Sequence, residues 1–384
     1  MRTLEKKTLG LYLHIPFCRS KCLYCDFCSQ PNRSESEHAA YTEALCRDLR
    51  ARAETCSAYT VDSVYVGGGT PTSLAPALLQ KILDTVFSCY HIEPHAEITV
   101  ECNPATESRA LFECLVSAGA NRLSIGAQSV HDGELRALGR LHCFSDLSKT
   151  VSDARAAGFE NLSVDVMFGI PLQTEESYLQ TLCKLSELQP NHISAYGLTV
   201  ETGTPFGRMG DRLRLPDEET TRRMYFSGIE LLAQRGFRQY EISNFALDGY
   251  ESRHNLKYWN CDEYLGFGPA AYSDFGGRRF GNSRDISSYL ANEDITEESE
   301  VPSPNDRKNE YVMLRMRLSE GIDCRAYQKR FGSSFESDYG DALSRYVNGG
   351  FVRKNAQGYA FTTDGMYVSN SILSEILCFD AGNC

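Results

Sequence analysis

From residue 10 to about residue 245, short apolar runs alternate with longer segments whose apolar residues recur at helical spacing. The short runs predict strands and the longer segments predict helices. The predicted strands are Leu11–Ile15, Ser63–Val66, Ile98–Glu101, Arg122–Ile125, Leu162–Val166 and His192–Leu198. The predicted helices are Glu37–Arg52, Ala75–Ser88, Ser108–Ala118, Leu147–Ala157 and Glu175–Leu188. Strands separated by helices form βαβ units, so we expect an α/β protein with a parallel sheet curved into a TIM-like barrel or partial barrel.

The pattern changes after about residue 300. Two prolines, Pro302 and Pro304, and the acidic run Glu297–Glu300 predict a linker or surface connection. The predicted elements beyond it are three helices, Asp306–Leu318, Asp323–Phe331 and Phe335–Val347, and a hairpin that turns at Asn355–Gly358. This order favours a small helical, winged-helix-like domain with a packing or docking role. We therefore predict a barrel (1–245), a barrel-closing segment (246–300) and a C-terminal domain (301–384).

Composition narrows the class of protein. The chain has 384 residues and a formal net charge of −12, which argues against nucleic-acid binding because phosphates are neutralised by Lys and Arg. Fifteen cysteines scattered over a long chain do not form the pattern of a disulfide framework. The first residues lack the apolar core of a signal peptide, and no stretch approaches the roughly 18 apolar residues of a membrane span. We expect a soluble, reduced, cytoplasmic protein.

Three cysteines in one short loop point to the chemistry. Cys18, Cys22 and Cys25 are spaced C-x3-C-x2-C directly after the first predicted strand. Three thiolates can each hold one iron of a [4Fe–4S] cluster and leave the fourth iron without a protein ligand. S-adenosyl-L-methionine (SAM) can chelate that iron, and one electron then splits SAM into methionine and a 5′-deoxyadenosyl radical. In this motif the sequence resembles the radical SAM superfamily.

A structural zinc site is the alternative interpretation of these cysteines. Such sites usually use two C-x2-C pairs or added histidines, and no such second group follows at a suitable spacing. Cys28, used as a fourth ligand, would leave no open iron, so we interpret it as a bystander.

Glycines and polar residues follow the next predicted strands. Gly67-Gly68-Gly69-Thr70 ends one strand, and Glu101, Gln128 and Asp165 end three others, with Arg140 twelve residues after Gln128. A glycine run lets the backbone approach a ligand, carboxylates accept hydrogen bonds from amines or ribose hydroxyls, and arginine clamps a carboxylate. Each residue alone is equally compatible with a cofactor-binding role and with an ordinary turn or surface hydrogen bond. Because active sites of such barrels lie at the carboxyl ends of the strands, together they predict a cofactor site.

These residues also bring a closer resemblance. Tyr12, the cysteine triad, the glycine loop and the residues at the strand ends are similar, in order and nearly in spacing, to the oxygen-independent coproporphyrinogen III dehydrogenase group. The likeness covers most of the chain and implies a [4Fe–4S] cluster on the three cysteines. The residues that it places around SAM are Tyr12, Tyr24, Gly68, Gly69, Thr70, Glu101, Gln128, Arg140, Asp165 and Ala195.

Two departures from that group favour its heme-chaperone (HemW) branch. Phe27 stands where the dehydrogenases carry a further cysteine, and only 17 residues precede Cys18. The H-N-x-x-Y-W motif of the branch is present as His254–Trp259, with Leu256 in place of its proline. The resemblance implies that His254 binds heme, since a neutral imidazole is a common axial ligand of heme iron. Alternatively, His254 is a hydrogen-bonded structural histidine and Trp259 a core anchor.

The expected function is that of a heme chaperone, which binds heme and transfers it to hemoproteins. The runner-up is a dehydrogenase that decarboxylates two propionates of coproporphyrinogen III to vinyl groups; RNA modification is disfavoured by the acidic balance. The expected cofactors are the cluster, SAM and heme. The expected partners are heme or a porphyrinogen and an acceptor hemoprotein, and the sequence is compatible with a homodimer and with peripheral membrane contact.

Overall fold

A computed structural model describes residues 7–104 and 108–377. Its main feature is a twelve-stranded sheet in the order β14-β13-β12-β11-β1-β4-β5-β6-β7-β8-β10-β9. The parallel strands are β1 (Lys7–Ile15), β4 (Tyr59–Gly68), β5 (Ile92–Cys102), β6 (Arg122–Gln128), β7 (Asn161–Phe168), β8 (His192–Gly197) and β11 (Tyr264–Phe267). The six predicted strands are therefore confirmed. Strands β14 and β9 are the two ends of the sheet, so the barrel is partial.

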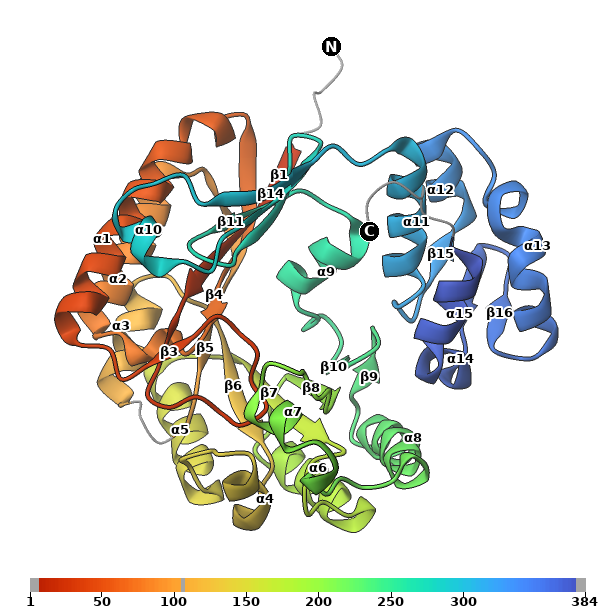
Figure 1. Ribbon diagram of the computed structural model, residues 1–384, viewed down its shortest axis with the longest axis horizontal. Coiled ribbons are helices and arrows are strands. Elements are labelled where there is room, and N and C mark those ends of the chain that lie inside the picture. The colour runs from red at the N-terminus through yellow and green to blue at the C-terminus, as the bar shows by residue number, and fades with distance from the viewer. Residues whose placement is uncertain (1–6, 105–107, 378–384) are drawn as a thin grey trace.

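Helices cover the outer side of the curved sheet (Figure 1). In chain order they are α1 (Glu35–Arg52), α2 (Pro76–Cys89), α3 (Arg109–Ser117), α4 (Asp132–Ala137), α5 (Phe144–Ala157), α6 (Glu175–Glu187) and α8 (Glu218–Gln234). The short helix α7 (Pro205–Met209) instead lies against the cysteine loop, where the Phe206 N–H donates to the Leu23 carbonyl. Three short 3-10 turns are η1 (Glu54–Cys56), η2 (Pro71–Ser73) and η3 (Gly210–Arg212). The start of α1 is determined by its local sequence, because Ser34 and Glu37 form a capping box that supplies hydrogen-bond partners to amides of the first turn.

Alternation along the strands separates two environments. In β1, Leu9, Leu11, Leu13 and Ile15 are completely buried within the hydrophobic core of the sheet and its helices. The residues between them point to the other face, where polar side chains such as that of Tyr12 predominate. A strand of this kind buries both of its faces, which is the usual situation for parallel sheets.

The segment that follows the barrel returns to its first strand. Two short strands, β9 (Arg238–Gln239) and β10 (Asn244–Ala246), extend the sheet beside β8. Helix α9 (Arg253–Asn260) lies on the inner side of the sheet and contacts β4 (Figure 1). The strands β11, β12 (Tyr272–Phe275), β13 (Arg278–Asn282) and β14 (Thr296–Glu300) then continue the sheet beyond β1, with α10 (Ile286–Leu290) between the last two.

One sequence prediction is wrong in this segment. The run Glu297–Glu300, expected as a linker or surface connection, belongs to edge strand β14, which pairs antiparallel with β13. An edge strand exposes much of its surface, so its side chains need not alternate between apolar and polar, and charged side chains are common there. The alternation of apolar and polar residues that identifies a strand in a sequence is therefore missing here. In the structure, Arg279 on β13 lies 3.6 Å from the Glu300 carboxylate.

The C-terminal part forms a second core. Its elements are α11 (Pro304–Arg315), β15 (Ile322–Asp323), α12 (Cys324–Phe331), α13 (Phe335–Asn348), β16 (Val352–Lys354), β17 (Gly358–Phe361), α14 (Thr363–Tyr367) and α15 (Ser369–Ile376). The three predicted helices and the hairpin are confirmed, and Val312, Tyr327 and Phe335 are completely buried among them. Arg307 on α11 makes two hydrogen bonds to the Asp274 carboxylate on β12, which ties this domain to the barrel.

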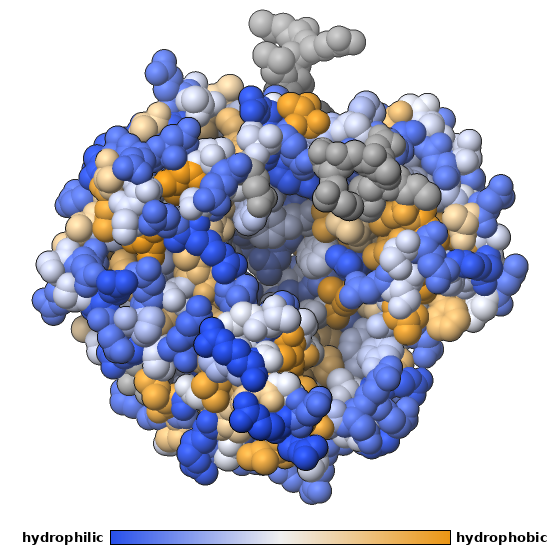
Figure 2. All heavy atoms as spheres, in the orientation of Figure 1, coloured by the Kyte–Doolittle hydropathy of each residue, from blue (hydrophilic) through white to orange (hydrophobic). Residues whose placement is uncertain are grey.

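The surface carries many of the charged and polar residues of the chain. Figure 2 shows a predominantly hydrophilic face that is hollowed near its centre, between the barrel and the C-terminal helices. No helix among residues 7–104 and 108–377 is both long and apolar enough to cross a membrane.

Leu13 and Leu172 offer a matched test of the barrel core, because Leu13 is 0% exposed and Leu172 is 71% exposed. We expect Leu13→Ala to lower the free energy of unfolding by about 2–5 kcal/mol, since it leaves a cavity under β1. The same change at Leu172 is expected to stay within about 0.5 kcal/mol. Urea denaturation followed by circular dichroism measures both, and equal losses would contradict the burial of β1.

Candidate functional site

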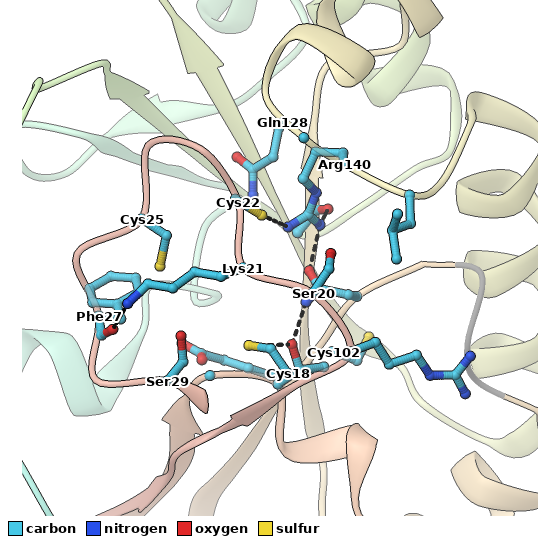
Figure 3. A pocket seen from close by; sticks show the side chains of 18 of the residues that line it. Cys18, Ser20, Lys21, Cys22, Cys25, Phe27, Ser29, Cys102, Gln128 and Arg140 are labelled. Atoms are coloured by element: carbon cyan, nitrogen blue, oxygen red, sulfur yellow. Dashed lines mark hydrogen bonds between the residues drawn. The ribbon is translucent and has the colours of Figure 1, made fainter. Parts of the chain in front are cut away.

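The cysteine loop leaves the carboxyl end of β1 and is closed by a small parallel pair, β2 (Phe17–Cys18) and β3 (Gln30–Pro31). Between these strands the Leu23 N–H donates to the Leu138 carbonyl at 3.0 Å and the Phe206 N–H donates to the Leu23 carbonyl at 3.0 Å. The loop is therefore fastened at its base and at its middle. Its three cysteines border one pocket at the carboxyl ends of the strands (Figure 3).

Burial raises the pKa of the Cys18 and Cys25 thiols, and polar groups lie beside two of the three sulfur atoms. The Sγ of Cys18 lies 3.5 Å from the Thr70 hydroxyl, and the Sγ of Cys22 accepts a hydrogen bond from the Arg140 guanidinium at 3.5 Å. Figure 3 shows Arg140 and Gln128 pointing toward Cys22. Three sulfur donors on one pocket, one of them beside a fixed positive charge, fit the ligand requirement of an iron–sulfur cluster with one open iron. Within the described ranges, no set of three Cys, His, Asp or Glu side chains meets at the spacing of a single metal ion.

The glycine loop is bound to the cysteine loop through the backbone. The Gly69 N–H donates to the Ile15 carbonyl at 2.8 Å, and the Thr70 N–H donates to the Phe17 carbonyl at 2.7 Å. Gly68 adopts φ +113°, and a Cβ on Gly69 would lie 2.5 Å from the Phe17 carbonyl oxygen. These two positions therefore require glycine, and the close approach leaves the loop backbone beside the cysteines.

Glu101, at the end of β5, is held by two donors. The Tyr65 hydroxyl donates to one carboxylate oxygen at 2.7 Å and the Gly68 N–H donates to the other at 3.0 Å. Burial raises the pKa of the Glu101 carboxyl to about 7, and these two hydrogen bonds oppose the shift. Burial also raises the pKa of Asp165 on β7, whose carboxylate accepts a hydrogen bond from Ser124 at 3.3 Å. Both carboxylates line the pocket.

Gln128 reaches the pocket through an irregular backbone. The pairing of β6 with β7 shifts register between Gly126 and Gln128, and Gln128 has φ +61°, an uncommon value for a residue with a side chain. The bulge turns the last residue of β6 toward the cysteines, as Figure 3 shows. Strained backbone positions that the surrounding structure holds in place cluster at active sites and ligand-binding loops.

Sequence analysis missed Asn103. Its side chain donates to the Thr70 hydroxyl at 2.5 Å and accepts from Arg140, so it joins the glycine loop to the arginine beside Cys22. Arg140 also donates to the Gly126 carbonyl at 2.6 Å. The signal was available, because Asn103 directly follows β5 two residues after Glu101, where polar residues of a parallel sheet converge.

The predicted site residues fall into two groups. The pocket brings together the three cysteines and the side chains or backbone of Tyr24, Gly68, Gly69, Thr70, Glu101, Gln128, Arg140 and Asp165. Tyr12, Ala195 and His254 do not line it. The Tyr12 hydroxyl is 3.0 Å from the Nδ1 atom of His14, and Ala195 is 6% exposed.

His254 is the largest departure from the expected arrangement. It is 1% exposed, its Nδ1 atom lies 2.9 Å from the Ser63 hydroxyl, and its Nε2 atom lies 2.8 Å from the Tyr258 hydroxyl. Burial lowers the pKa of His254 to about 3, so the ring is neutral at physiological pH. In this arrangement both ring nitrogens already have hydrogen-bond partners, as the alternative interpretation of the motif expects.

Two family models match parts of this chain. The radical SAM superfamily model matches residues 12–185, and the model of the HemN C-terminal domain matches residues 303–368. The heme chaperone HemW of Lactococcus lactis subsp. lactis is 31% identical over 379 residues, which cover 98% of this chain and 99% of that protein. HemW of Haemophilus influenzae is 33% identical over 378 residues and covers 96% of this chain and 98% of that protein.

A solved structure has the same architecture. Coproporphyrinogen III oxidase (HemN) from Escherichia coli, a radical SAM enzyme, is 22% identical with a TM-score of 0.86 and covers 97% of this chain and 90% of that one. This likeness confirms the predicted fold, a radical SAM partial barrel with a helical C-terminal domain. The family model and the two relatives matched over nearly their full length show that the chain belongs to the radical SAM superfamily and, within it, to the family of the heme chaperone HemW.

Proposed function

We propose that Cys18, Cys22 and Cys25 hold a [4Fe–4S] cluster and that the pocket beside them binds SAM. The donor set supports this assignment, because three thiols share a pocket with a glycine loop and with Glu101. The two carboxylates, Glu101 and Asp165, are suited to accept hydrogen bonds from the amine and hydroxyl groups of SAM. When bound, the cluster and SAM would supply one-electron chemistry. The role of the chain is to hold both in a fixed geometry.

The protein acts as a heme chaperone in this proposal: it binds heme and transfers it to an acceptor hemoprotein. The observation that carries it is the similarity of nearly the whole chain to proteins named heme chaperone HemW. Phe27 supports the same choice, since it stands where the dehydrogenase group carries a further cysteine and is 68% exposed at the edge of the pocket. The likeness to HemN concerns the fold and leaves the decarboxylation of coproporphyrinogen III as the competing outcome.

Cys22 and Cys28 offer a matched test of the cluster ligands. We expect Cys22→Ser to abolish cluster assembly, because an iron would lose its thiolate, whereas Cys28→Ser should retain the iron and sulfide content of the parent. Cys28 lies within the same loop, with its Sγ 3.8 Å from the Arg284 carbonyl, so its replacement controls for disturbance of the loop. Iron and sulfide analysis after anaerobic reconstitution measures both variants. Loss of the cluster in Cys28→Ser would contradict the three-ligand assignment.

The pKa of Glu101 predicts a pH dependence of SAM binding. Below a pH of about 7 this carboxyl gains a proton and loses its attraction for an ammonium group, so the affinity for SAM is expected to fall as the pH drops through that value. In Glu101→Gln the affinity should be lower than that of the parent above pH 7 and similar to it at lower pH, so this step should disappear. Equilibrium binding of SAM across the pH range measures it, and an unchanged step in the variant would assign the titration to another group.

The two functions are separated by supplying both substrates. We expect the purified protein to bind heme, seen as a Soret band, and to restore a heme-depleted hemoprotein to its holo form. Under anaerobic conditions, with the cluster reduced and SAM present, coproporphyrinogen III is expected to remain unconverted. Formation of protoporphyrinogen over many turnovers would identify a decarboxylating dehydrogenase and overturn the chaperone proposal.

A further inference from the structure

Helix α9 is anchored inside the barrel by its first turn. The N–H groups of Arg253 and His254 donate to the two carboxylate oxygens of Glu97 on β5, each at 3.0 Å. The Ser252 side chain caps the same turn by accepting from the Asn255 N–H at 3.4 Å. A buried carboxylate at a helix N-terminus satisfies amides that would otherwise lack partners. The start of α9 therefore has a fixed position against the sheet.

The imidazole of His254 is buried between α9 and the strands β1 and β4. Ser63 on β4 and Tyr258 on the next turn of α9 occupy its two nitrogens. A Cβ on Gly10 of β1 would lie 3.3 Å from its Cε1 atom, so the ring packs closely against that strand. One ring nitrogen of a neutral imidazole donates and the other accepts, and two hydroxyl partners can complement either tautomer.

The face of this ring is in contact with the system that holds Glu101. The Tyr65 ring stacks on His254, with centroids 5.3 Å apart and an interplanar angle of 30°. The same Tyr65 donates its hydroxyl to Glu101, and Glu101 accepts the Gly68 N–H of the glycine loop. A continuous series of contacts therefore runs from α9, through one tyrosine and one carboxylate, to the backbone beside the cysteines.

From this series we infer that His254 is a positioning residue of the SAM pocket: it fixes Tyr65, and through it Glu101 and the glycine loop, and it is not a heme ligand. The inference rests on the proposed binding of SAM. Without the imidazole, a cavity opens beside the Tyr65 ring. The Tyr65 hydroxyl then no longer has a fixed orientation toward the Glu101 carboxylate. Ligation of iron by His254 would instead require a ring nitrogen to give up its hydroxyl partner in the buried interior, where lost hydrogen bonds are costly.

The chain contains a matched control for this histidine. His192 on β8 has the same kind of surroundings, with Nδ1 2.8 Å from the Ser163 hydroxyl, Nε2 2.9 Å from the Tyr240 hydroxyl, and 1% exposure. Its ring contact is with Tyr240, whose hydroxyl also accepts the Ser252 N–H at 3.2 Å, whereas the ring that stacks on Tyr65 is that of His254. Loss of His192 therefore removes an equivalent buried imidazole and leaves the stacking of His254 on Tyr65 and the Tyr65–Glu101 hydrogen bond in place.

The experiment compares His254→Ala and His192→Ala in the reconstituted full-length protein. For each we would measure iron content, SAM affinity, the change that SAM causes in the electron paramagnetic resonance spectrum of the reduced cluster, and heme binding by the Soret band. We expect His254→Ala to weaken SAM binding by about tenfold or more, in line with other outer-shell substitutions, and to bind heme as the parent does. His192→Ala should keep both affinities. Unchanged SAM affinity in His254→Ala would overturn the inference, and so would an equal loss of SAM affinity in His192→Ala. Loss of heme binding in His254→Ala would also overturn it.

Two hydroxyl deletions keep the test decisive if the alanine variant does not fold. Tyr65→Phe retains the ring and removes only the bond to Glu101, so it should weaken SAM binding and shift the spectrum. Tyr258→Phe frees the Nε2 atom of His254 and should leave heme affinity unchanged. Stronger heme binding in Tyr258→Phe would identify His254 as the ligand and overturn the inference. If the parent protein binds no SAM, the proposed function fails first and the inference with it, whereas binding by the parent and by both His254→Ala and Tyr65→Phe rejects the inference alone.

Discussion

Two backbone hydrogen bonds, from Gly69 and Thr70 to the carbonyls of Ile15 and Phe17, decide where everything else at the site can lie. They join the end of β4 to the segment that leads into the cysteine loop, and they exist only because the glycines allow the two backbones to approach. The carboxylate of Glu101 then binds the amide of Gly68, and Asn103 binds the side chain of Thr70. Hydrogen bonds thus join the cysteine loop, the glycine loop and the strand ends into one connected unit.

A second constraint is the polar interior of the barrel. Arg122 is 2% exposed, and its Nε atom lies 3.9 Å from the Glu97 carboxylate. Its positive charge lowers the pKa of Glu101 and of Asp165, against the larger effect of burial, which raises both. Buried charges of opposite sign compensate one another only when their positions are fixed. The close packing of α9 against β4 and β5 therefore contributes to the electrostatics of the pocket as well as to its shape.

Much of this arrangement could be read from the sequence. Alternation of strand and helix patterns predicted the parallel barrel because buried strands have a distinctive apolar composition, and the position of residues such as Glu101 and Asp165 after those runs predicted a shared pocket. Strand ends were less visible, since β4 extends over Tyr59–Gly68 while its apolar centre is shorter. Asn103 resembles a turn residue before proline. The surroundings of His254 depend on Ser63, 191 positions away, and no local pattern records such a contact.

The acidic edge strand β14 has a consequence for assembly. Sheets with an open edge tend to recruit a second strand, and a copy of this chain offers one of the same length. Glu297 and Glu300 are exposed on β14, so antiparallel pairing of two such edges would bring carboxylates of both copies together. The opposite edge, β9, spans only Arg238–Gln239. Charge at one end and shortness at the other therefore disfavour edge-to-edge association of the sheet.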